Sequence, residues 1–162
     1  MLRRVVYIWM IAFILLAGMS RPVHAADPGW NEEDVQLLFF GDSRTQGLAM
    51  CAGGCVYIGK TAAGYAWMSG EGYALLQDTM QRYPDADIIF CFGVNDLGNV
   101  YAYADFFKEF VKTYPERNAW FCSVNPIADQ YAAANGYAVR NASVEAFNAV
   151  MKEELPDYYV DT

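Results

Sequence analysis

The fold of this chain follows from one stretch of its sequence, Leu37-Leu38-Phe39-Phe40-Gly41-Asp42-Ser43-Arg44. A short, wholly apolar run from Val35 to Phe40 that ends at a glycine is typical of a strand buried on both faces of a parallel sheet. A helical stretch is expected to begin near Ser43 and to run into the loop at 51–55. This strand followed by a helix predicts a βα unit, with Ser43 at the carboxyl end of the strand.

The same alternation of strand and helix continues along the chain. Further apolar strands are predicted at 56–58, 87–92, 119–124 and 158–161. Helices are predicted at 73–83, 101–114 and 141–155, the last with Asn141 or Ser143 as its N-cap, and residues 128–138 are expected to form a loop. Residues 26–162 therefore predict one α/β domain, a three-layer α/β/α sandwich around about five parallel strands.

The first 25 residues have the composition of a signal peptide. Arg3 and Arg4 precede an apolar run over 5–19, and residues 22–25 end in the small-residue pattern at which signal peptidase cuts. An uncleaved membrane anchor is the alternative, but a helix of fifteen residues spans about 22 Å against a hydrocarbon core of roughly 30 Å. We therefore expect export, cleavage after Ala25 and no membrane attachment afterwards.

The charge of the chain narrows its partners. The 162 residues include 11 basic and 19 acidic side chains, a net charge of −8. Cleavage after Ala25 removes three arginines and no acid, which leaves 8 basic against 19 acidic residues, a net charge of −11. Nucleic acid and anionic lipid are themselves negatively charged. The negative net charge of the protein would repel them, so we expect neither to bind through general electrostatic attraction.

Four cysteines remain to be placed. Cys51 and Cys55 flank a short Ala-Gly-Gly loop and could close a small disulfide ring, since export permits disulfides. Neither a second cysteine pair nor a histidine lies near them, so they predict no zinc site and no other metal site. Cys91 and Cys122 lie inside apolar strands and are expected to be buried free thiols. The disulfide pairing stays open.

Three loops bring polar groups to the carboxyl ends of the strands, where parallel sheets place their functional groups. Ser43 offers a hydroxyl and an N–H group, Gly64 offers a backbone N–H group, and Asn95 offers a side-chain amide. Together they predict a nucleophile and an oxyanion cradle for acyl transfer. Each has a purely structural alternative: Ser43 as a helix N-cap, Gly64 as a turn glycine, and Asn95 with Asp96 as a turn.

This constellation resembles the SGNH hydrolases, also called GDSL-type esterases and lipases, over residues 35–162. Gly41-Asp42-Ser43 matches their first block and Gly93-Val94-Asn95-Asp96 the third. Gly64 matches the glycine of the second block, with Gly59 as its rival. The resemblance is to a secreted bacterial subgroup. It implies a flavodoxin-like sheet and ester hydrolysis through an acyl-serine intermediate at Ser43, with Asn95 as oxyanion donor and no cofactor.

One block of the family pattern is missing. SGNH hydrolases carry an Asp-x-x-His block after the fifth strand, whereas the only histidine of this chain is His24. A last strand without a closing helix would also leave an exposed sheet edge. We therefore expect the chain to be C-terminally incomplete, with its general base beyond residue 162 and little or no activity as given. Asp42 is expected to hold the turn and not to act as a base.

The substrate side of the prediction rests on Arg44, Tyr65 and Trp67. Arg44 could contact an anionic group or lie on the solvated surface. Tyr65 and Trp67, with Tyr101, Tyr103 and Tyr131, could form an aromatic rim that stacks on sugar rings, or they could fill the core. The rim predicts a small-molecule or glycan ester as substrate. The alternative function is a non-catalytic carbohydrate-binding or interaction module that keeps the pocket without the base.

Overall fold

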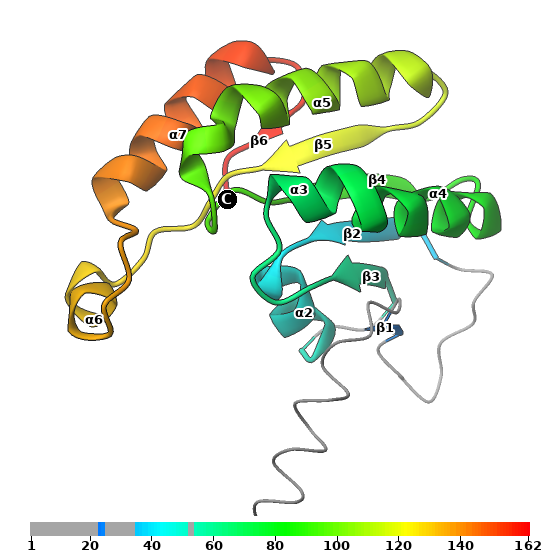
Figure 1. The fold of residues 1–162 in the computed structure, drawn as a ribbon. Coiled ribbons are helices and arrows are strands. Elements are labelled where there is room, and N and C mark those ends of the chain that lie inside the picture. Colours follow the sequence, from blue (N-terminus) through cyan, green and yellow to red (C-terminus); the bar gives the residue numbers. More distant parts are fainter. Residues whose placement is uncertain (1–22, 25–34, 52–53) are drawn as a thin grey trace, which may run out of the picture.

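The computed structural model describes residues 23–24, 35–51 and 54–162, which form one α/β domain around a single sheet (Figure 1). The sheet order is β1-β3-β2-β4-β5-β6. Its strands are β1 (Val23–His24), β2 (Leu37–Gly41), β3 (Val56–Gly59), β4 (Asp87–Cys91), β5 (Ala119–Cys122) and β6 (Tyr159–Val160). Strands β2 to β6 are parallel, and β1 pairs antiparallel with β3. The predicted sheet of five parallel strands is confirmed, in the flavodoxin-like order.

Strand β1 falls inside the segment predicted to be a signal peptide. The rest of residues 1–25 lies outside the described part of the chain, so the signal peptide stays a prediction. Among the residues that are described, no helix combines the length and the apolar character needed to cross a bilayer.

Helices lie on both faces of the sheet (Figure 1). The longer ones, α4, α5 and α7, cover one face, whereas α2 packs against β2 and β3 on the other. The helical segments are α2 (Ser43–Ala49), α3 (Tyr65–Trp67), a π-helical turn (Met68–Gly72), α4 (Tyr73–Arg82), a 3-10 turn (Leu97–Asn99), α5 (Val100–Thr113), α6 (Asp129–Ala134) and α7 (Asn141–Glu154).

The helix predicted at 73–83 is confirmed as α4, and the short α3 and the π-helical turn, which bends at Gly70, precede it unpredicted. Two other local predictions were wrong. The loop predicted over 128–138 contains α6. Neither Asn141 nor Ser143 caps α7, because the Asn141 side chain bonds in both directions with the backbone of Ile127, at 2.8 Å each. Arg140 is the N-cap residue, and it caps without a side-chain hydrogen bond.

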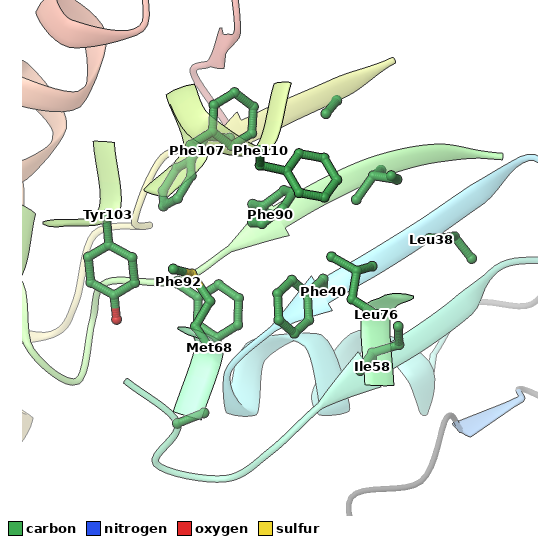
Figure 2. Close-up of a cluster of buried hydrophobic side chains, with 14 of the residues drawn as sticks. Leu38, Phe40, Ile58, Met68, Leu76, Phe90, Phe92, Tyr103, Phe107 and Phe110 are labelled. Carbon is green, nitrogen blue, oxygen red and sulfur yellow. The ribbon is translucent and has the colours of Figure 1, made fainter. Parts of the chain in front are cut away.

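The core lies between the sheet and α4, α5 and α7, and it is built largely from aromatic rings (Figure 2). Phe90 on β4 is fully buried, and its ring centroid lies 5.4 Å from Phe40, 5.1 Å from Phe107 and 5.0 Å from Phe110. All three are edge-to-face contacts, the arrangement that the quadrupoles of aromatic rings favour. These rings anchor β2 and β4, whose carboxyl ends carry the candidate site.

Candidate active site

Ser43 is the first residue of α2 and follows directly from the turn at the end of β2. The N-cap of the helix is Asp42, whose carboxylate accepts a hydrogen bond from the N–H of Arg44 at 2.9 Å. The alternative of Ser43 as N-cap is therefore wrong. Ser43 is exposed, and its hydroxyl and N–H bond to no residue in the described ranges. The first N–H groups of a helix have no intrahelical partner, so this one is available to a ligand.

Asp42 is the structural residue that the sequence predicts. Its side chain is fully buried, and its two oxygens accept from Nε and Nη2 of Arg44, at 3.0 and 2.9 Å. The N–H of Asp42 donates to the carbonyl of Cys91 at 3.1 Å and ties the turn to β4. Arg44 also reaches the carbonyl of Ser123 at 3.5 Å. The Arg44 side chain is one quarter exposed, and its guanidinium is held by these protein partners. It therefore lies neither free at a substrate rim nor fully in solvent.

Gly64 and Asn95 lie on two loops that contact each other. The Asn95 side-chain amide donates to the carbonyl of Ala63 at 2.8 Å. Because a primary amide carries two N–H donors, its second N–H remains for a ligand, and the residue is exposed. Gly64 precedes α3, and its N–H has no acceptor in the part of the chain that is described. Two donors from neighbouring loops thus lie unpaired at one edge of the sheet.

The contact between these loops explains the glycine at 64. A Cβ atom there would lie 2.5 Å from the Asp96 carboxylate, so only glycine fits without displacing it. The same carboxylate accepts from the N–H of Tyr65 at 2.7 Å. Gly59, by contrast, is the buried last residue of β3 and packs against Gln46 of α2. The geometry therefore places Gly64, not Gly59, beside the Asn95 loop.

Asp96 is a residue whose role the sequence reasoning missed. Besides Tyr65, it binds the side-chain amide of Asn99 at 2.9 Å and the hydroxyl of Tyr103 at 2.5 Å. Tyr103 is fully buried, and burial, followed by the hydrogen bond to Asp96, raises the pKa of its hydroxyl far above the ordinary value. Tyr103 is thus a neutral donor that holds Asp96 in place. The only sequence signal was an acid next to the candidate asparagine.

Only some of the aromatic residues predicted to form a rim are exposed. Trp67 is 9% exposed and packs on Phe40 and Phe92, with ring centroids 5.7 and 6.1 Å apart, so its ring fills the core, as the alternative interpretation expects. Tyr103 is a core residue as well, as Figure 2 shows. Tyr65 is half-buried, with its ring edge-on to Tyr103 at 5.5 Å. The two exposed rings of the set are those of Tyr101 and Tyr131.

A hollow of about 530 Å³ opens beside Asn95. It lies between the loop after β4 and the amino-terminal half of α7, and its walls are mostly aliphatic, with no charged side chain. The lining residues are Val94, Asn95, Leu97, Gly98, Val100, Ala138, Val139, Ser143, Ala146, Phe147 and Val150. Its volume is that of an ordinary small-molecule site. Asn95 belongs to its wall, so this apolar hollow borders one of the candidate oxyanion donors.

The backbone of His24 lies away from this site. The backbone of His24 pairs with Val56 at the amino end of β3, opposite to the edge from which Ser43 emerges. Within the described ranges, no cluster of side chains that could hold a metal ion occurs. The described residues at the candidate site thus supply an exposed hydroxyl and hydrogen-bond donors but no imidazole.

Comparison with known proteins shows a likeness of fold. No family model matches the chain, and no curated protein matches its sequence. Among solved structures, the chain is similar to an acetyl xylan esterase, AlAXEase (TM-score 0.55, 13% identity, 78% of this chain and 76% of that one). It is also similar to a lipase/acylhydrolase from Enterococcus faecalis (TM-score 0.53, 14% identity, 76% and 72%).

A third similar structure is a protein from Streptococcus pneumonia named for platelet activating factor (TM-score 0.55, 16% identity). It matches 79% of this chain, and this chain spans 65% of its length. The predicted three-layer α/β fold with a flavodoxin-like sheet is therefore confirmed, and these solved structures share it. At these identities, the likeness is one of architecture.

Proposed function

We propose that this chain is the acyl-transfer domain of a serine esterase of the SGNH type. The observation that carries the proposal is the state of Ser43. It is exposed at the start of a helix, with neither its hydroxyl nor its N–H bonded within the described residues. The fully buried Asp42 carboxylate beneath it pairs with Arg44, and the Asp42 N–H ties the turn to β4. A structural serine gains nothing from this exposure, whereas a nucleophile requires it.

The proposed chemistry uses groups of three loops. The Ser43 hydroxyl oxygen attacks the ester carbonyl carbon, and its proton passes to a base. The N–H groups of Ser43 and Gly64 and the second N–H of the Asn95 amide stabilise the negative oxygen that develops. Removal of one such donor typically lowers turnover about 10²- to 10³-fold. The carbon–oxygen bond to the alcohol then breaks, and water hydrolyses the acyl-serine in a second step.

The general base is the group that the described residues do not supply at this edge. The resemblance implies a histidine in an Asp-x-x-His block after the fifth parallel strand, and turnover at full rate needs that histidine. The second candidate function is a binding module that retains the pocket without hydrolysis, since the Asn95 amide and the apolar hollow beside it can also hold a ligand that does not react. The test must therefore detect acylation of Ser43 when turnover is slow.

The proposed substrate is a small-molecule or glycan ester whose acyl group enters the apolar hollow beside Asn95. Aliphatic walls without a charged side chain suit an alkyl chain better than a sugar ring. The exposed rings of Tyr101 and Tyr131 are left as candidate contacts for a sugar on the alcohol side. The composition of residues 1–25 supports a place outside the cell for this reaction.

Acylation by p-nitrophenyl esters tests the proposal. The chain is incubated with p-nitrophenyl butyrate, with and without imidazole as an external base, and the Ser43 peptide is examined by mass spectrometry. We expect a butyryl group on Ser43 and nitrophenol release that imidazole accelerates. Ser43→Ala should lose both, whereas Ser69→Ala should keep both, because Ser69 only bonds the carbonyl of Tyr65. Equal rates for the chain and Ser43→Ala, with ester binding retained, would instead support the binding module.

A further inference from the structure

Two cysteines meet at the carboxyl edge of the sheet, on the face opposite to the main core. The parallel register pairs Phe90 of β4 with Phe121 of β5, so Cys91 and Cys122, each one residue further, lie side by side. Neighbouring strands are about 4.7–4.9 Å apart, which lies within the roughly 4.4–6.8 Å that separates the Cα atoms of disulfide-bonded cysteines. Sequence reasoning expected two separate buried thiols, because only the register brings them together.

The two thiols differ in acidity. Their mutual interaction lowers the pKa of Cys122 and, together with burial, raises the pKa of Cys91 well above its ordinary value. The nearby guanidinium of Arg44 favours the thiolate of both. Because the thiolate is the nucleophilic form, Cys122 is the attacking member of the pair.

A small reagent has access to this pair. Both cysteines line a hollow of about 330 Å³, together with Arg44, Ser123 and Asn125. Each is partly exposed, and the structure leaves both as free thiols. The pair therefore combines proximity, an activated member and an opening to solvent.

We propose that Cys91 and Cys122 form a reactive dithiol, a modification site that closes to a disulfide by exchange with a low-molecular-weight disulfide. The Cys122 thiolate attacks one sulfur of the reagent and releases one thiolate, which leaves a mixed disulfide on Cys122. Cys91 then gives up its proton and attacks the Cys122 sulfur, which releases the second thiolate. The protein loses two protons and two electrons, and the reagent is reduced to two thiols.

The expected product joins the ends of β4 and β5 next to the turn that displays Ser43. The N–H of Asp42 donates a hydrogen bond to the carbonyl of Cys91. One partner of the new disulfide would therefore be bonded directly to the turn that carries Ser43. This site does not depend on the proposed esterase function, because its chemistry needs only the two thiols and a disulfide reagent.

Peptide mapping tests the proposal in a Cys51→Ser/Cys55→Ser background, which removes the other two thiols. The folded chain is treated with hydroxyethyl disulfide at mildly alkaline pH, quenched with acid and digested with trypsin. We expect the peptides 83–108 and 118–140 to be joined, with the loss of two hydrogens. Two separate adducts without a cross-link, or two unreacted thiols, would overturn the proposal.

Single variants test the order of attack. With Cys91→Ser, the reaction should stop at a mixed disulfide on Cys122. With Cys122→Ser, Cys91 should react several-fold more slowly, because its thiolate is disfavoured. Circular dichroism before treatment verifies that each variant is folded, and the double-serine background remains decisive if a single variant is not. Faster reaction of Cys91 than of Cys122 would contradict the assignment of the attacking thiol.

Discussion

The two faces of the sheet are covered to different extents. On the face under α4, α5 and α7, the strand side chains are completely buried, as in Leu38, Phe40, Ile88 and Phe90. On the other face, α2 covers β3 and part of β2, and alternate residues such as Phe39 are only half-buried (Figure 1). Because side chains alternate along a strand, one run of apolar residues builds both a dense core and a thinner layer.

The difference separates stability from chemistry. The aromatic core under the three longer helices anchors the strands, whereas the Asp42–Arg44 turn and the cysteine pair lie at the carboxyl edge toward the thinner layer. Asp96 connects the core with the sheet edge. Its carboxylate accepts a hydrogen bond from Tyr103 of the core and packs against Gly64 of the edge loop. The comparison therefore predicts large stability effects on one face and effects on reactivity at the edge.

Two neighbouring phenylalanines give the largest expected contrast. Phe40→Ala should lower the free energy of unfolding by about 3–5 kcal/mol, because it removes a fully buried ring that packs on Phe90 and Trp67. Phe39→Ala removes the same atoms from the half-buried face, where the ring stacks on Tyr57, and should cost about half as much. Urea denaturation of both variants measures the difference. Equal losses would show that the faces contribute alike.

Two ion pairs give the next contrast. Arg44→Ala leaves the fully buried Asp42 carboxylate without its cation and should destabilise the fold by about 3 kcal/mol. Lys108→Ala breaks a solvent-accessible pair with Glu154, between α5 and α7, and should cost less than about 1 kcal/mol. Thermal denaturation compares the two variants. A larger loss from Lys108→Ala would contradict the view that Asp42 and Arg44 hold the turn.

The two hollows, one beside Asn95 and one lined by the cysteines, should give a smaller contrast, in substrate specificity. Ala146→Trp should fill the apolar hollow beside Asn95 and lower kcat/KM for an octanoyl ester about tenfold relative to an acetyl ester. Leu48→Trp, at an exposed residue of the hollow that the cysteines line, is the matched control and should leave that ratio unchanged. Rates with p-nitrophenyl esters of both lengths measure it, with imidazole added. An unchanged ratio for Ala146→Trp would remove the acyl chain from this hollow.

Sequence patterns predicted the parallel sheet well, because an apolar run such as 37–41 and the amphipathic pattern of 100–113 carry local signals. They missed the helical turns at 65–72, where Gly70 and Gly72 lower the helix propensity and the packing of Trp67 against the core compensates. The burial of Trp67 was not predicted for the same reason, since it depends on residues distant in the sequence.

The candidate site was predicted in part. The turn at 41–44 carries its own local signal, so the sequence alone could place its polar residues at the sheet edge. The choice between Gly59 and Gly64, the role of Asp96 and the meeting of Cys91 with Cys122 could not be predicted, because each depends on contacts between loops or on strand register.

The smallest expected effect concerns two tyrosines of α5, Tyr103 in the core and Tyr101 in solvent. Tyr103→Phe removes only the hydroxyl that donates to Asp96 and should cost about 1 kcal/mol at neutral pH. Tyr101→Phe, at an exposed position two residues earlier, should cost nothing measurable. Urea denaturation at neutral pH compares both variants with the unmodified chain.

The pH dependence of Tyr103 sharpens this comparison. Burial and the Asp96 hydrogen bond raise the pKa of the folded-state hydroxyl, whereas the unfolded chain ionises near the ordinary value of about 10. The stabilising contribution of this hydroxyl is therefore complete below about pH 10 and is lost progressively as the pH rises above it. The stability advantage of the unmodified chain over Tyr103→Phe should shrink in that range. An advantage that stays constant would show that Tyr103 ionises alike in the folded and unfolded chain.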